Sequence, residues 1–144
     1  MATRAGFITF LRNAGFTTTV LPDASIDIDS ALALSLEIVY HQIQEVSQLL
    51  YDQAVYNLST SYLIEYATDQ TGQTFFADKR KEFKINSFTQ GLVQSSGDEG
   101  TNASLTVPDW ANKLTFADLQ MLKTPWGKMY LSIAQRTGSL WGIS

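Results

Sequence analysis

The apolar residues in the first half of the chain follow a helical spacing. Phe7, Phe10 and Leu11 stand at i, i+3 and i+4, which predicts a short amphipathic helix over residues 6–16, with Gly15 at its end. A longer stripe then repeats at intervals of three and four residues, as one face of a helix requires. Its members are Ile28, Leu32, Leu36, Val39, Ile43, Val46 and Leu50.

No glycine or proline interrupts residues 23–71. A single helix of that length, rising ~1.5 Å per residue, would be longer than a small domain is wide. We therefore expect a break near residues 40–45 and a second helix over about 46–68. Because this second segment has apolar residues on more than one side, we expect it to be the central, most buried element.

The pattern changes after Gly72. Residues 75–84 predict a short helix with a basic face, and residues 85–107 then lose the helical period. Two apolar arms flank the polar turn cluster SSGDEGTNAS at 95–104, which indicates a β-hairpin or extended arm. An isolated hairpin is marginally stable, so we expect this arm to pack on a neighbouring copy. The apolar residues of the arm are Phe88, Leu92, Val93, Leu105 and Val107.

The last helix has a clear start signal. Thr124 is an N-cap residue type, and Pro125 follows at the first helical position. We expect Trp126, Met129, Tyr130 and Ile133 to form its apolar stripe and Gly138 to end it.

Beyond Gly138, the segment SLWGIS carries three apolar side chains outside any helix: Leu140, Trp141 and Ile143. Tryptophan is the residue type most enriched among interface anchors, and an apolar tail left in water is unfavourable. We favour docking of this tail into another chain. The alternative is that it folds back onto its own core.

Together these elements predict a mainly α protein, a small helical bundle with a β-hairpin or extended arm and a C-terminal tail. A length of 144 residues suits one domain. The helical body is expected to comprise residues 1–84 and 108–138, the arm residues 85–107, and the docking tail residues 139–144.

The amino-acid composition excludes several kinds of catalytic and metal-binding site. The chain has no cysteine and one histidine, His41, which falls in the expected break, so thiolate sites and histidine clusters are excluded. Asp23, Asp27 and Asp29 lack the glycine and glutamate of an EF-hand loop and are better explained as acids at a helix start. No apolar run is long enough to span a membrane. We expect no catalysis, no metal, no cofactor and no membrane association.

Two other functions remain open at this point. Lys79, Arg80, Lys81 and Lys84 form the one basic run; a solvated helix face is the default, and a small non-catalytic regulatory protein that binds nucleic acid through residues 79–84 is the alternative. The net charge of −4 and a pI near 4.8 weigh against general nucleic-acid binding. A hydrolase using the carboxylates Glu37 and Glu65 is the weakest hypothesis, because both are expected to face solvent.

Nearly the whole chain is similar to one family. The segments that carry the similarity are FITFLRNAGF, IDIDSALALSLEIV, AVYNLSTSYLIEYA, FTQGLVQSSGDEGTNASLTV and LTFADLQMLKTPWGKMYLSIAQR. They resemble the head–tail connector proteins (adaptor or head-completion proteins) of tailed bacteriophages. The specific part is a motif near the end, in which Trp126 replaces the tyrosine of the family pattern: Thr124, Pro125, Trp126, Gly127, Tyr130 and Leu131.

The resemblance implies a structural virion protein, made in the host cytoplasm and located in the neck between head and tail. It implies a ring, typically of twelve copies, beneath the portal protein, with a further neck or tail protein on the opposite face. The central channel would conduct DNA as non-specific cargo. The C-terminal segment would dock on the portal through Arg136, Leu140, Trp141 and Ile143.

Overall fold

The structure is a computed structural model that describes residues 1–85 and 121–136. Over these two ranges the chain is mainly helical and contains no strand, which confirms the mainly α class. The helices are α1 (Arg4–Asn13), α2 (Ile26–Ile38), α3 (Ile43–Val46), α4 (Gln48–Tyr66), α5 (Phe75–Glu82) and α9 (Pro125–Arg136). Apart from Ile85, the predicted hairpin arm lies outside the described residues, and so does the tail at 139–144. The arm and tail residues concerned are Phe88, Leu92, Val93, Leu105, Val107, Leu140, Trp141 and Ile143.

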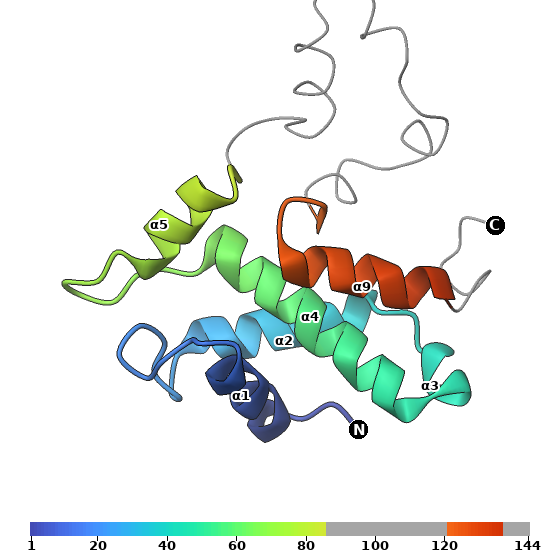
Figure 1. The fold of residues 1–144 in the computed structure, drawn as a ribbon. Helices are drawn as coiled ribbons and strands as arrows, with labels where there is room; N and C mark the ends of the chain where they lie inside the picture. Colours follow the sequence, from blue (N-terminus) through green and yellow to red (C-terminus); the bar gives the residue numbers. More distant parts are fainter. Residues whose placement is uncertain (86–120, 137–144) are drawn as a thin grey trace, which may run out of the picture.

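Helix α4 is the centre of the fold, as predicted for residues 46–68. It packs against α9 on one side and against α2 and α1 elsewhere (Figure 1). Its buried residues lie all around the helix rather than on one face, because neighbours cover it from several directions. The hydrophobic core of the described residues therefore forms around α4.

The buried polar side chains of α4 are satisfied within the helix itself. The hydroxyls of Ser59 and Thr60 donate to the carbonyl oxygens of Val55 and Tyr56, at 2.7 and 2.8 Å. The Asn57 amide and the Ser61 hydroxyl bond in the same way to carbonyls three or four residues earlier. Such bonds let small polar residues occupy a core without an unpaired group.

Thr3 is the N-cap residue of helix α1, and its hydroxyl accepts a hydrogen bond from the Gly6 amide at 3.0 Å. Its predicted apolar residues Phe7 and Leu11 are fully buried. Gly15 follows the helix with a φ of +98°, a left-handed conformation that favours glycine. The predicted helix is therefore confirmed, with bounds of 4–13 instead of 6–16, and Gly15 lies two residues beyond its last helical residue.

The predicted break between the two long helices is also confirmed. Helix α2 ends at Ile38, the one-turn α3 follows, and Ser47 caps α4 by accepting a hydrogen bond from the Leu50 amide at 3.3 Å. The break changes the direction of the chain. The stripe residues Val39 and Ile43 are still buried at the break, and the stripe is interrupted at Val46. Val46 was predicted to be on the buried face and is 61 % exposed. His41 is exposed in the connection, as expected.

The aspartates at the start of α2 join separate parts of the fold. Asp29 pairs with Arg4 of α1 at 2.5 Å, and Asp23 pairs with Arg12. The carboxylate of Asp27 accepts a hydrogen bond from the Thr68 amide at 3.1 Å, just after α4. Asp27 and Asp29 do lie in the first turn of α2, but these contacts show a wider structural role than the predicted helix-start one.

Among the described residues, none of the helices combines the length and the apolar character that crossing a membrane requires.

Candidate functional site

The motif near the end of the chain builds the start of α9. Thr124 is fully buried, and its hydroxyl oxygen accepts a hydrogen bond from the Gly127 amide at 2.9 Å. Pro125 occupies the first helical position, where no amide hydrogen is needed. The predicted N-cap is confirmed. This arrangement fixes where α9 begins and the direction in which it leaves the preceding chain.

The remaining motif residues attach α9 to the body. A Cβ placed on Gly127 would lie 2.1 Å from the carbonyl oxygen of Met121, so only glycine allows this close approach. The Trp126 ring meets Phe16 and Phe83 edge-on, with centroids 5.5 and 6.1 Å away. Tyr130 and Leu131 are buried. All six motif residues therefore lie at one joint between α9 and the rest of the body.

An apolar groove of about 590 Å³ runs beside this joint, between α4 and α9 with one residue from α1. Leu49 is 68 % exposed and Met129 is 51 % exposed on its walls. Met129 was predicted on the buried stripe of α9 and instead faces this groove. The lining residues are Phe10, Leu49, Leu50, Gln53, Asn57, Pro125, Trp126, Met129, Ser132, Ile133 and Arg136.

Arg136 is the one predicted tail-docking residue that the structure describes. It is the last residue of α9, is exposed, and lies on the wall of the groove. Sequence reasoning missed the groove itself. The available signal was Leu49, an apolar residue next to the predicted stripe position Leu50, on a helix with apolar residues on several sides.

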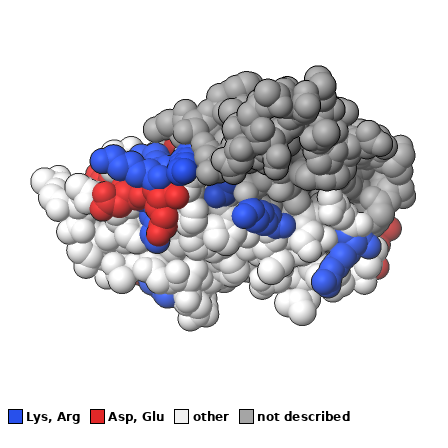
Figure 2. Space-filling model, turned by 45° about the horizontal axis from the view of Figure 1, so that its top comes forward, with Lys and Arg blue, Asp and Glu red and all other residues white. Residues whose placement is uncertain are grey.

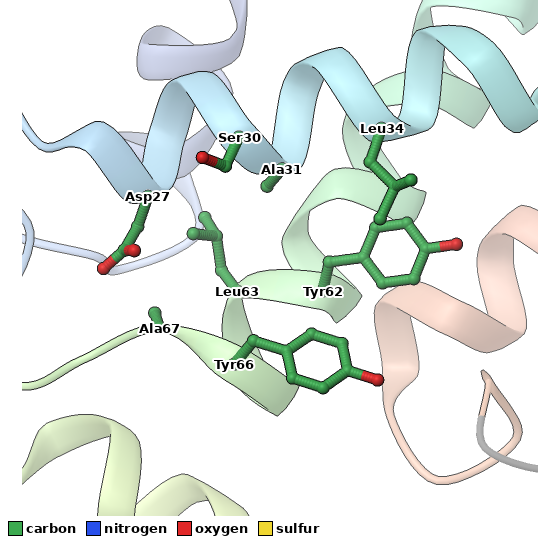
Figure 3. A pocket seen from close by; sticks show the side chains of 8 residues that line it. All are labelled: Asp27, Ser30, Ala31, Leu34, Tyr62, Leu63, Tyr66 and Ala67. Atoms are coloured by element: carbon green, nitrogen blue, oxygen red, sulfur yellow. The ribbon is translucent and has the colours of Figure 1, made fainter.

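A smaller pocket of about 100 Å³ lies between α2 and α4. Figure 3 shows Ala31 and Leu34 of α2 opposite Tyr62 and Tyr66 of α4, with Asp27 at the start of α2. The two tyrosine rings are 6.5 Å apart. Burial, followed by the nearby Tyr130 and Glu65, raises the pKa of Tyr62 to about 12.

The two carboxylates of the hydrolase hypothesis differ in their surroundings. Glu37 is exposed on α2, as predicted. Glu65 was also predicted to face solvent but is half-buried, and burial raises its pKa, while a hydrogen bond from Tyr66 and the charge of Lys123 act in the opposite direction. Neither carboxylate lines either of the two hollows described above.

The basic run on α5 serves the fold more than was expected. The Arg80 side chain donates from Nε to the carbonyls of Ile64 and Glu65, at 2.9 and 3.1 Å, and from a terminal nitrogen to the Ala67 carbonyl. It thereby satisfies carbonyl groups at the end of α4. The interpretation of the run as a solvated face holds for the exposed Lys81 and Lys84 and is wrong for Arg80.

Lys79 is also engaged within the chain. Its ammonium pairs with Glu82 at 3.2 Å and lies 5.7 and 5.8 Å from the ring centroids of Phe75 and Phe83. On the face shown in Figure 2, the described surface is mostly uncharged, and acidic side chains lie directly beside a group of basic ones.

Within residues 1–85 and 121–136 no group of three or more potential metal-ligating side chains comes together. No family model, no curated protein and no solved structure matches the chain. The candidate site is therefore defined by its geometry alone: the joint at the start of α9, the adjoining apolar groove, and Arg136 at the end of the helix.

Proposed function

We propose that the chain is a head–tail connector of a tailed bacteriophage. In this proposal, copies of the chain form a ring, typically of twelve, between the portal protein and the next neck or tail component of the virion. The central channel lets DNA pass as non-specific cargo. Segment 139–144 docks on the portal, and the arm at 85–107 packs on the neighbouring copy.

The observation that carries this proposal is the joint at the start of α9. The six residues that resemble the connector motif are distributed over eight positions, yet every one of them helps to cap, orient or bury this helix. A helix fixed so firmly at its start presents its far end, Arg136, in a defined position. The segment proposed to dock on the portal follows directly from that end.

A ring requires heterologous contacts, in which one surface of a copy meets a different surface of the next. The described body offers exposed apolar side chains for such contacts, on more than one helix. Ile26 and Leu34 on α2 are 75 % and 45 % exposed, and Tyr66 on α4 is 73 % exposed. Leu34 and Tyr66 lie together on the walls of the pocket between α2 and α4, and a neighbouring copy that covers them would remove both side chains from water.

The nucleic-acid-binding alternative loses support from α5. Two of the four basic residues in the run at 79–84 make contacts inside the chain: Arg80 at the end of α4 and Lys79 beside Glu82. Two exposed lysines remain, Lys81 and Lys84, which is a weak basis for a phosphate-binding surface.

The proposal is tested by mixing the purified chain with its portal protein and examining the product by sedimentation and electron microscopy. We expect a ring-on-ring complex with the full chain. A chain ending at residue 138 should keep the helical circular dichroism of the full chain and lose the complex. A matched control replaces residues 139–144 by six glycine and serine residues, which keeps the length, and should also lose the complex.

The possible results separate the parts of the proposal. If the shortened chain still forms the complex, the assignment of the tail is wrong. If the full chain forms no complex with the portal under any condition that keeps both proteins folded, the connector function is wrong.

A further inference from the structure

The groove between α4 and α9 presents apolar side chains that the described body leaves uncovered. Leu49 on α4 and Met129 on α9 are more than half exposed, and the half-buried Leu50 and Trp126 complete its walls. We infer that in the free chain this groove binds the chain's own segment 139–144, through Leu140, Trp141 and Ile143. The inference goes beyond the proposed function and does not depend on it.

The first argument is position. Arg136 is both a wall of the groove and the last residue of α9, so the chain leaves the helix at the groove itself. Only Thr137 and Gly138 separate Arg136 from the segment. Glycine after a helix end is the residue type that permits the left-handed conformation with which a chain turns back.

The second argument is length. Pro125 and Arg136 mark the two ends of the groove along α9. The helix rises about 16.5 Å over the eleven residue steps from one to the other, at ~1.5 Å per residue. Six extended residues reach about 20 Å, at ~3.3 Å per residue, so the segment is long enough to cover the groove from end to end.

The third argument is chemistry. The groove contributes aliphatic, aromatic and thioether side chains, and the segment contributes an aliphatic, an aromatic and a second aliphatic side chain. Removing both surfaces from water is favourable in proportion to the apolar area that is buried. Methionine sulfur beside an aromatic ring adds a further favourable contact, which places Trp141 against Met129.

The same chain is favoured over a second copy as the source of the segment. A connection of two residues gives an effective concentration in the millimolar range, far above that of a dilute solution of separate copies. If the proposed function is correct, the groove and the portal then compete for one segment, and free copies keep their apolar tails covered until they meet the portal.

The test uses the full chain with 13C-labelled methionine methyl groups. The chain has three methionines, and only Met129 lies on the groove. Met1 is 88 % exposed and Met121 is 6 % exposed, so they report on the surface and on the core. The substitution Trp141→Ala removes an aromatic ring current, and we expect the Met129 methyl signal to move while the Met1 and Met121 signals stay in place. Ser144→Ala, a change of a polar residue in the same segment, is the matched control and should leave all three signals unmoved.

Each result decides the inference. A Met129 signal that moves with Trp141→Ala and is independent of protein concentration supports binding within one chain. A Met129 signal that Trp141→Ala leaves unmoved overturns the inference. A difference between the two variants that disappears on dilution also overturns it, because the segment then comes from a second copy. None of these results involves the portal, so failure here is distinguishable from failure of the connector proposal.

Discussion

Gly127 is the single residue on which the position of α9 depends most directly. Its amide hydrogen bonds to the Thr124 hydroxyl, and its missing side chain lets α9 approach the Met121 backbone. Backbone atoms cannot yield as the end of a flexible side chain can. A methyl group added here must therefore push the helix away from the body.

We expect Gly127→Ala to lower the free energy of unfolding by about 1–3 kcal/mol, the range typical of overpacking a filled site. Chemical denaturation followed by circular dichroism measures the change. Gln135→Ala, at an exposed position of the same helix away from the groove, is the matched control and should change stability by less than about 0.5 kcal/mol. Equal stabilities for Gly127→Ala and the unaltered chain would contradict this account of the joint.

Glu65 gives a pH-dependent prediction. Burial raises its pKa above the unfolded value of 4.5, so the ionised form is disfavoured in the folded chain. The folded state is therefore helped below about pH 4.5, where the carboxyl is protonated in both states, and this help is lost as the pH rises through the folded pKa. At neutral pH the native chain bears the cost of an ionised, half-buried carboxylate.

We expect Glu65→Gln to be more stable than the unaltered chain at pH 7, and the difference to shrink as the pH falls through the raised folded pKa towards about 4.5, below which it stays small. Thermal unfolding at a series of pH values measures it. Glu37→Gln, at an exposed position on α2, should show no comparable trend. A Glu65→Gln variant that is less stable than the native chain at pH 7 would mean that the attraction to Lys123 outweighs burial.

Residue-level features differ in how far sequence predicts them. Thr124 followed by Pro125 is a local signal, since the cap bonds to an amide three residues away, and it was predicted correctly. The surroundings of Glu65 and Arg80 depend on contacts from other helices. Arg80 reaches carbonyls 13 to 16 residues earlier in the chain, and no local pattern contains that information.

Among the helices, α4 and α5 are joined by hydrogen bonds from that arginine as well as by the buried Phe76. The end of α4 leaves carbonyl groups without partners inside the helix, and Arg80 binds three carbonyls in this region. A second set of hydrogen bonds ties the connection between the two helices to the start of α5. The carboxylate of Asp69, which follows α4, accepts hydrogen bonds from the Phe76 and Ala77 amides at 2.7 and 3.1 Å.

We expect Arg80→Met to destabilise the chain by about 2 kcal/mol or more, because a hydrogen bond from a charged group to a buried acceptor is worth about 1.5–3 kcal/mol. Methionine keeps much of the apolar length of the side chain and removes the donors. Lys81→Met, one position along and exposed, is the matched control and should have little effect. Denaturant unfolding of both variants measures the difference. Similar losses in the two would show that Arg80 acts only as a surface charge.

The spacing of apolar residues predicted where the helices lie better than it predicted which of their residues are exposed. The long uninterrupted segment had to break because of its length, and the break falls where expected. Val46 lies within the same numerical stripe as the buried Ile43, but the one-turn α3 ends there and the stripe changes direction. A periodic pattern predicts a buried face only while the helix that carries it continues.

For the whole molecule, sequence predicted a mainly α body centred on residues 46–68, and the described residues agree. It could not predict the groove between α4 and α9. The shape of such a groove depends on the distance and angle between two helices that are about 70 residues apart in the chain, and these are set by the packing of side chains from both helices.

The side chains of Asn57, Ser59, Thr60 and Ser61 have one further effect. Each bonds to a carbonyl of its own helix, so these four bonds would survive if a neighbouring helix slid along α4. These four hydrogen bonds need no partner from another helix, so they add no directional constraint on how α2 and α9 pack against α4. The central helix therefore brings a row of polar side chains into the core while leaving the surfaces that meet its neighbours to be matched by shape.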